Sequence, residues 1–259
     1  MNKKFIVANW KMAPATVAHA QDILDAANDA LDTYQERKEL SLIFCPPFVF
    51  IEEIAHILHT SHLLHEASLG AQDISTQDEG SLTGEVSGPM LRRLGVQYCI
   101  VGHSERRWKL GESDEIVNQK LKAVLRNELV PIVCLGEKVR DDGYIKFLQE
   151  QTKMTFANLI KSDVEKCIIA YEPVWAVSSG NDSRPDTPEE ALEAINVIRN
   201  LLLKMYGINN VRCLYGGSVT EKNAADFLSH DGIDGILVGS ASVKKDEFTK
   251  IITKAAGIV

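Results

Sequence analysis

Short apolar segments rich in β-branched residues recur along the whole chain, and they constrain its fold more than any other feature. They cover residues 5–8, 42–45, 68–71, 98–101, 131–135, 168–171, 211–215 and 235–238. Their apolarity is continuous rather than alternating, which is typical of strands buried on both faces, as in parallel sheets. The chain therefore predicts eight buried parallel strands.

Segments of helical character separate these runs, among them residues 17–31, 115–127, 144–160 and 188–206. The last is well marked at its start, because Thr187 can cap it, Pro188 suits its first position and Glu190 completes a capping box. Eight units in 259 residues give about 32 residues each, the size of a strand plus a helix. We therefore expect an α/β fold, a single-domain (β/α)8 barrel over residues 1–259 with a closed parallel sheet, in preference to an open doubly wound sheet.

Composition and charge exclude several classes of protein. The 28 Lys and Arg against 36 Asp and Glu leave a net charge of −8, which argues against nucleic acid as the main partner. No apolar stretch approaches the roughly 18 to 20 residues that cross a bilayer, so we expect no membrane partner and a cytoplasmic location. The five cysteines form no Cys-x-x-Cys pair and lie in or beside apolar runs, which indicates buried, reduced thiols.

Polar and small residues follow five of the predicted strands, at the ends where a barrel of this kind places its chemistry. These segments are Asn9-Trp10-Lys11, Gly102-His103-Ser104-Glu105-Arg106-Arg107, Glu172-Pro173-Val174-Trp175, Gly216-Gly217-Ser218 and Gly239-Ser240. Because all strands of a parallel barrel end on the same side, we expect these segments to face one mouth.

Two loops of small residues follow the last two predicted strands. Gly216-Gly217-Ser218 and Gly239-Ser240 leave backbone N–H groups unshielded, and each precedes a segment of helical character. Such turns bind anions through direct hydrogen bonds and through the positive end of a helix dipole. Either loop alone is more often a plain turn, but together at these two strand ends they indicate a phosphate site.

Three side chains at the predicted mouth can do chemistry, and each also has a purely structural interpretation. Lys11 could neutralise a phosphate or a developing oxyanion, or it could be a solvated surface residue. Glu172 has apolar neighbours and could accept a proton, or it could pair with an arginine. His103 opens a segment that could begin a helix, where a ring that accepts N–H bonds stays neutral and can donate to a carbonyl; otherwise it is structural.

A lysine, a neutral histidine, a carboxylate and a phosphate site suit proton abstraction beside the carbonyl of a small phosphorylated ligand. The carboxylate removes a carbon-bound proton, and the histidine and lysine stabilise the enediolate oxygen. Return of the proton to the adjacent carbon interconverts a ketose and an aldose. This chemistry needs no cofactor.

Four histidines, His56, His59, His62 and His65, recur at every third position. A step of three residues turns a helix by about 300°, so these side chains drift around the cylinder instead of sharing one face. We interpret them as exposed residues around a helix end, with adventitious metal binding by one His-x-x-His pair as the alternative. No spacing resembles a metalloenzyme motif, so we expect no metal site.

Seven motifs resemble those of the triosephosphate isomerase family, in the family's order and over nearly the whole chain. They are Asn9-Trp10-Lys11-Met12, Ala71-Gln72-Asp73-Ile74-Ser75, Thr83-Gly84-Glu85-Val86-Ser87, Val101-Gly102-His103-Ser104-Glu105-Arg106-Arg107, Cys134-Leu135-Gly136-Glu137, Ala170-Tyr171-Glu172-Pro173-Val174-Trp175-Ala176 and Tyr215-Gly216-Gly217-Ser218-Val219. The resemblance implies a TIM barrel, a homodimer, and interconversion of dihydroxyacetone phosphate and D-glyceraldehyde 3-phosphate.

The resemblance also implies roles for individual residues. The base would be Glu172, the neutral electrophile His103, and the cation on the substrate oxygens Lys11. The other members contact substrate, support these three or form a lid: they are Asn9 on a substrate oxygen, Ser178, Ser218, Gly239 and Ser240 at the phosphate, Ser104 and Glu105 as support, and Trp175, Ala176 and Gly180 in the lid. The lid would close over the intermediate and exclude water. In the dimer, the loop of residues 75–84 would reach into the partner subunit, with Glu85 pairing with Arg106.

The chain departs from the family mainly around the phosphate and the lid. Family members usually have Gly-Thr-Gly-Lys after the Trp-Ala-Ile run, whereas residues 178–186 read Ser-Ser-Gly-Asn-Asp-Ser-Arg-Pro-Asp and the stretch is longer. Gly239-Ser240 replaces a usual pair of glycines, Met12-Ala13-Pro14 lacks a common Asn-Gly, and Ser81-Leu82 replaces Ala with an aromatic. An altered lid could admit a longer substrate, so isomerisation of a four-carbon erythrulose phosphate is the alternative function. A non-catalytic phosphate-binding barrel is a more distant one.

Overall fold

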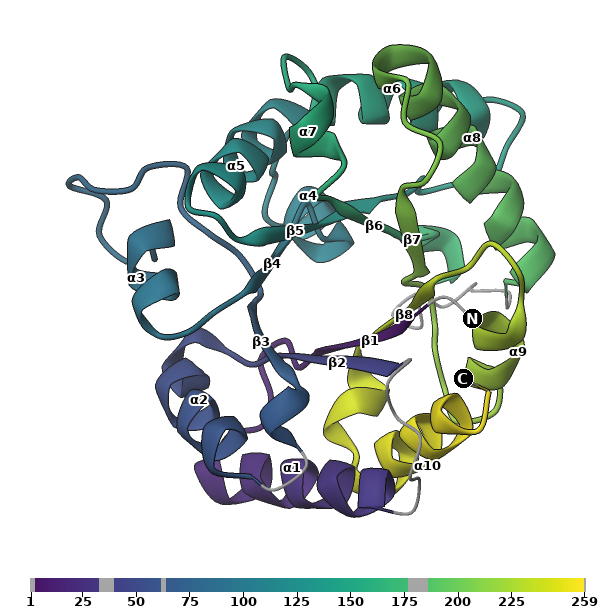
Figure 1. Cartoon of the computed structure of the whole chain (residues 1–259). Coiled ribbons are helices and arrows are strands. Elements are labelled where there is room, and N and C mark those ends of the chain that lie inside the picture. The colour runs from purple at the N-terminus through teal and green to yellow at the C-terminus, as the bar shows by residue number, and fades with distance from the viewer. Residues whose placement is uncertain (1–2, 33–39, 62–63, 177–185, 259) are drawn as a thin grey trace.

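The sheet of the computed structural model is a closed barrel with strands in the order β1 to β8 (Figure 1). The structure describes residues 3–32, 40–61, 64–176 and 186–258. In these residues the strands are β1 (Lys4–Asn9), β2 (Leu40–Cys45), β3 (Ser68–Ala71), β4 (Tyr98–Val101), β5 (Val130–Leu135), β6 (Ile168–Tyr171), β7 (Arg212–Tyr215) and β8 (Gly235–Val238). Each neighbouring pair is parallel, and β8 pairs back to β1, which confirms the predicted (β/α)8 barrel and excludes the open sheet.

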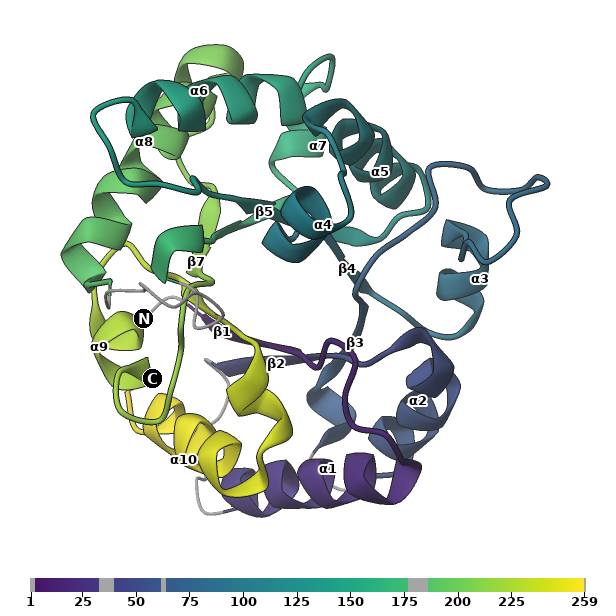
Figure 2. The same ribbon diagram turned by 180° about the vertical axis from the view of Figure 1, so that it is seen from behind.

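Helices surround the barrel, and short 3-10 turns interrupt four of the connections in the described part of the chain (Figure 1). The helices are α1 (Val17–Asp32), α2 (Ile51–Thr60), α3 (Gly88–Arg93), α4 (Ser104–Lys109), α5 (Asp114–Arg126), α6 (Tyr144–Thr155), α7 (Lys161–Val164), α8 (Pro188–Tyr206), α9 (Ala224–Ser229) and α10 (Lys245–Ala256). The turns are η1 (Phe48–Phe50), η2 (Leu64–Glu66), η3 (Val174–Ala176) and η4 (Ser240–Val243). In Figure 2 the barrel is seen from the side of α4, which follows the carboxyl end of β4.

Two helix ends test the local predictions. Helix α8 begins as expected, because Thr187 Oγ1 accepts a hydrogen bond from Glu190 N at 3.2 Å. Helix α6 ends at Thr155 rather than at residue 160, so the prediction of a longer helix was wrong. Asn158 has a left-handed φ of 59°, which a right-handed helix cannot include, and Asn118 Nδ2 satisfies the freed Thr155 carbonyl at 2.8 Å.

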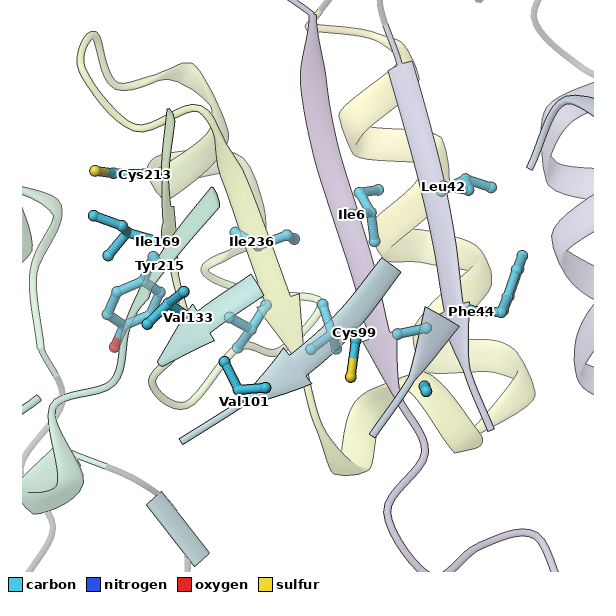
Figure 3. Packing of buried hydrophobic residues seen from close by; sticks show 14 of the residues in the cluster. Ile6, Leu42, Phe44, Cys99, Val101, Val133, Ile169, Cys213, Tyr215 and Ile236 are labelled. Carbon is cyan, nitrogen blue, oxygen red and sulfur yellow. The ribbon is translucent and has the colours of Figure 1, made fainter. Parts of the chain in front are cut away.

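Successive strand residues pack on opposite faces of the sheet. One buried cluster holds strand residues alone and fills the barrel: Phe5, Val7, Ile43, Cys45, Ile100, Ile132, Cys134, Ile168, Ala170, Leu214 and Leu237. Their strand neighbours join a larger cluster with the helices, which Figure 3 shows for residues such as Ile6, Phe44 and Val133. Burial on both faces explains why the strands read as continuous apolar runs.

The state of the cysteines was predicted from the sequence. All five cysteines are buried and carry free thiols, which confirms their predicted state. Among the helices described, none is both long and apolar enough to cross a membrane.

Candidate active site

The predicted strand-end segments meet at the carboxyl mouth of the barrel. A small cavity of about 30 Å³ is lined by Asn9, Lys11, His103, Ser104, Gly216, Gly217, Ser218, Val219, Leu237, Gly239 and Ser240. A wider cavity of about 450 Å³ shares Asn9, Lys11 and His103 with it and adds Glu105. Residues from β1, β4, β7 and β8 therefore face one space, as the sequence predicts.

His103 lies between β4 and α4 and caps that helix. Its Nδ1 accepts a hydrogen bond from the backbone N–H of Glu105 at 3.2 Å. A ring nitrogen that accepts carries no proton, so the ring is neutral and its proton is on Nε2. His103 Nε2 lies 3.3 Å from Glu172 Oε1. The ring thus presents a neutral N–H donor to the mouth, beside a carboxylate.

Glu172 follows β6 directly and is 2% exposed. Its Oε2 accepts a hydrogen bond from Ser104 N at 2.7 Å, whereas its buried Oε1 has no hydrogen-bond partner. In the described chain, no arginine forms an ion pair with it, so the structural alternative from the sequence does not hold there. A buried carboxylate oxygen with an unused lone pair beside a neutral imidazole can accept a proton.

Glycines on the neighbouring strands make room for Glu172. A Cβ on Gly136 would collide with the backbone carbonyl of Glu172, and one on Gly216 would lie 2.9 Å from its Cγ. The Glu172 backbone is fixed in turn by its N–H, which donates to Leu135 O at 2.8 Å. The side chain is therefore held in a slot between the ends of β5 and β7.

Lys11 is held in an unusual backbone conformation, with a φ of 55° in the left-handed region. Its N–H donates to Asn9 Oδ1 at 3.2 Å, and Gln72 Nε2 donates to its carbonyl at 3.0 Å. Its Nζ lies 3.1 Å from Glu105 Oε1. Burial raises the pKa of Glu105, but the charge and hydrogen bond of Lys11, with smaller contributions from other basic groups nearby, leave the pKa below its usual value, so this carboxylate stays charged.

The two small-residue loops border the same space. A Cβ on Gly239 would lie 3.4 Å from Lys11 Nζ, and one on Gly217 would collide with the Tyr215 hydroxyl. Turn η4 begins at Ser240 itself, whereas the helix after the other loop, α9, begins only at Ala224. The helix-dipole argument from the sequence therefore fits the β8 loop better than the β7 loop.

The start of the predicted lid is described, and the rest lies outside the described residues. Trp175 Nε1 donates to Glu137 Oε1 at 2.9 Å, and the Tyr171 hydroxyl donates to the same oxygen at 2.7 Å. Ala176 is buried. Ser178 and Gly180 fall within residues 177–185 and are not among those described.

In the described residues there is no group of three or more His, Cys, Asp or Glu that could hold a metal ion. His56 and His59 are exposed on α2, while His62 and the side chain of His65 lie outside the described part.

Two residues that shape the mouth, one after a strand and one on a helix, have no assigned role in the sequence prediction. Gln72 follows β3 directly and donates to the carbonyls of Lys11 and Cys45, the latter at 2.9 Å. Arg107 lies on α4 and donates to the Gly102 carbonyl at 2.7 Å. The rule that residues after strands build the site would have found Gln72. Arg107 lies in a segment that this rule selected, but its sequence position does not show which carbonyls it contacts.

The fold and the mouth together define a class: barrel proteins with a lysine, a neutral histidine and a carboxylate set beside two loops of small residues. The model of the family described as triosephosphate isomerase matches residues 4–255. The chain belongs to the triosephosphate isomerase family, whose members are isomerases.

The chain is similar to bacterial triosephosphate isomerases over nearly the whole length of both chains. It is 37% identical to the triosephosphate isomerase of Caldanaerobacter subterraneus, over 97% of this chain and 99% of that protein. It is 39% identical to that of Carboxydothermus hydrogenoformans, over 97% and 98% of the two chains. It is 38% identical to that of Aquifex aeolicus, over 96% and 98%.

Proposed function

We propose that this chain is a triose-phosphate isomerase, which interconverts dihydroxyacetone phosphate and D-glyceraldehyde 3-phosphate through an enediolate. One observation carries the proposal: Oε1 of Glu172, which has no hydrogen-bond partner, lies 3.3 Å from the proton-bearing Nε2 of His103, at a mouth bordered by the two loops of small residues. Membership of the family supports the same assignment.

The reaction follows from the positions of these groups. Glu172 takes a proton from the carbon beside the carbonyl, and the electron pair left behind moves onto the carbonyl oxygen. His103 Nε2–H donates to that oxygen, and the Lys11 ammonium stabilises its negative charge. His103 then gives its Nε2 proton to this oxygen and takes the proton of the neighbouring hydroxyl, which moves the negative charge to the second oxygen. The carboxylic acid of Glu172 returns its proton to the carbon that carried the carbonyl, and the carbonyl re-forms on the other carbon, which converts ketose to aldose. No cofactor takes part in these steps.

Substrate binding is assigned to the loops and to the first strand end. Backbone N–H groups of Ser218, Gly239 and Ser240 would hold the phosphate, with Ser178 of the lid adding to them. Asn9 and Lys11 would contact the substrate oxygens, since both line the cavity with His103. Ser104 supports the base through its bond to Glu172 Oε2, and Glu105 supports Lys11 and His103.

The test is a coupled assay on the purified protein with the triose phosphates and, in parallel, a four-carbon erythrulose phosphate. We expect turnover of the trioses and much weaker turnover of the four-carbon ketose. Comparable or better activity on the four-carbon substrate would overturn the triose assignment. Binding of inorganic phosphate without turnover of either substrate would favour the non-catalytic barrel.

A homodimer is part of the proposal. The segment between β3 and α3 projects from the barrel (Figure 1), and exposed apolar side chains lie on it and near the mouth, Leu82 among them. Met12 is 97% and Leu110 65% exposed, and both line the wider cavity at the mouth; contiguous exposed apolar surface marks interaction sites. Light scattering of the purified protein tests the assembly, and a monomer at micromolar concentration would contradict it.

The ion pair expected in the dimer is not formed within one chain. Arg106 pairs with Asp73 and Glu112, at 2.8 and 2.7 Å, and Glu85 is exposed. Pairing of Glu85 with Arg106 therefore stays a prediction for the contact between subunits. A cytoplasmic location is likewise proposed, and the five free, buried thiols support it.

A further inference from the structure

The guanidinium of Arg107 occupies a junction behind the candidate active site. Its side chain is 6% exposed, and it donates to groups on four neighbouring elements. The acceptors are Gly102 O at 2.7 Å, Cys134 O at 3.2 Å, Thr155 Oγ1 at 3.4 Å and Asp114 Oδ1 at 2.5 Å. Two of them are backbone carbonyls at the carboxyl ends of the adjacent strands β4 and β5.

One of these carbonyls is one residue from His103, and the other is one residue from the carbonyl that holds the backbone of Glu172. Gly102 directly precedes His103. Cys134 directly precedes Leu135, whose carbonyl accepts the backbone N–H of Glu172 at 2.8 Å. One rigid, planar guanidinium thus connects the backbone of His103 to the backbone that fixes Glu172. A lysine ammonium could not span both carbonyls in this way, because it lacks the fixed fork of donors.

The local backbone is shaped around this side chain. Gly102 has a left-handed φ of 70°, and a Cβ there would lie 2.8 Å from Arg107 Nη2 and 2.8 Å from Val117 Cγ1. A side chain at position 102 would therefore displace the guanidinium. The position of Arg107 therefore requires glycine at position 102, directly before His103.

We propose that Arg107 is a positioning residue for the reaction, which sets the distance between His103 and Glu172 by tying the ends of β4 and β5 together. This inference rests on the proposed function. It differs from a general stabilising role, because the loops that would bind phosphate follow β7 and β8 and do not contact Arg107. Loss of the two hydrogen bonds from Arg107 to the carbonyls of Gly102 and Cys134 should therefore lower kcat and leave KM nearly unchanged.

The chain contains a matched control in Arg199 of α8. This arginine also donates to two backbone carbonyls, Val211 O at 3.2 Å and Gly232 O at 2.7 Å, and to a carboxylate, Asp234 Oδ2 at 2.8 Å. Its acceptors lie around the beginnings of β7 and β8, at the end of the barrel opposite the mouth. Arg199→Lys removes a comparable set of bonds without touching the site.

The experiment compares Arg107→Lys with Arg199→Lys. We expect kcat of Arg107→Lys to fall about 10- to 100-fold, as a displacement of up to about 1 Å in the reacting groups would cause, with KM changed less than about threefold. Arg199→Lys should keep the wild-type kcat although its unfolding midpoint in urea falls. Unchanged kcat in Arg107→Lys, or a change confined to KM, would overturn the proposal.

Two further measurements distinguish a failure of this proposal from a failure of the proposed function and from misfolding of the variant. In a His103→Gln background, Arg107→Lys should reduce kcat by a much smaller factor than in the wild type, whereas an equal factor would mean that it does not act through the pair. The ring ¹⁵N signals of His103 report its environment even if the wild type turns over no triose, and they should shift in Arg107→Lys but not in Arg199→Lys. If Arg107→Lys does not fold, Asp114→Asn loosens the same guanidinium, and unchanged kcat and His103 signals there would overturn the proposal.

Discussion

Two buried carboxylates at strand ends, Glu172 after β6 and Asp73 after β3, are equally hidden but differently used. Glu172 is 2% exposed and Asp73 6%. Both oxygens of Asp73 accept from Lys120 Nζ, at 2.7 and 2.6 Å, and Arg106 pairs with it as well. Glu172 keeps one oxygen without a partner. Burial alone therefore does not mark a reactive carboxylate; Glu172 combines burial with an oxygen that has no hydrogen-bond partner and lies beside His103.

The largest expected effect is that of replacing Glu172. Glu172→Gln keeps the shape but removes the proton acceptor, so we expect kcat to fall by about 10³-fold or more, near the upper range of general-base catalysis. Its stability in urea should not fall, because an amide oxygen can still accept from Ser104 N. Steady-state kinetics and urea unfolding of one preparation test both statements, and an active variant would remove Glu172 as the base.

For Asp73, whose partner is Lys120, we expect the opposite: loss of the pairing should lower stability and leave kcat nearly unchanged. Lys120→Met leaves the buried carboxylates of Asp73 and Glu112 with fewer positive partners, so we expect a loss of about 3 kcal/mol in the free energy of unfolding. The kcat at a temperature where the variant is folded should change little. A variant as stable as the wild type, or one inactive while folded, would break the contrast between the two carboxylates.

Asp186 sharpens the comparison because its buried Oδ2 also has no hydrogen-bond partner. Burial raises its pKa to about 7, above the usual 3.8. The folded state therefore holds this proton more tightly than the unfolded chain, and the stability gained at low pH is lost as pH rises from about 4 to about 7. Asp186→Asn should be more stable than the wild type by about 2 kcal/mol at pH 8 and by much less at pH 4.

Thermal or urea unfolding of both proteins at the two pH values tests this. Thr187 N donates to Asp186 Oδ1 at 2.9 Å, and an asparagine oxygen keeps that bond. Equal stability differences at both pH values would show that Asp186 does not titrate in this range.

The smallest effect is expected for an exposed ion pair. Arg92 and Glu128 lie 2.7 Å apart, with side chains 46% and 77% exposed. Such pairs contribute about 0 to 1 kcal/mol, so Arg92→Gln should change the free energy of unfolding by less than about 0.5 kcal/mol. A loss as large as that of Lys120→Met would mean that burial does not govern these interactions.

The sequence predicted the fold well because the decisive pattern is local. Strands that are buried on both faces must be apolar at every position, and this signature is readable without knowing their partners. Lys11, His103 and Glu172 were found by the same logic, since each directly follows or nearly follows a strand. Their convergence at one mouth of the barrel needed only the rule that parallel strands end together.

What escaped prediction depends on contacts between distant segments. The bonds of Gln72 to Lys11 and of Arg107 to Cys134 join residues far apart in sequence, and no local pattern announces them. The end of α6 was missed for a similar reason. Apolar spacing continues past Thr155, but the helix stops at a left-handed Asn158, and Asn118 of α5 binds the released carbonyl.

The closure of the sheet has a consequence for how the chain acquires its structure. Phe5 of β1 pairs with Gly235 of β8, so the first and last strands must meet before the barrel exists. Until β8 has left the ribosome, β1 and β7 present unpaired backbone groups that can pair with another chain. The barrel is thus completed by the last strand of its sequence. A chain cut short before residue 235 would keep two unpaired strand edges, which can pair with other chains and aggregate.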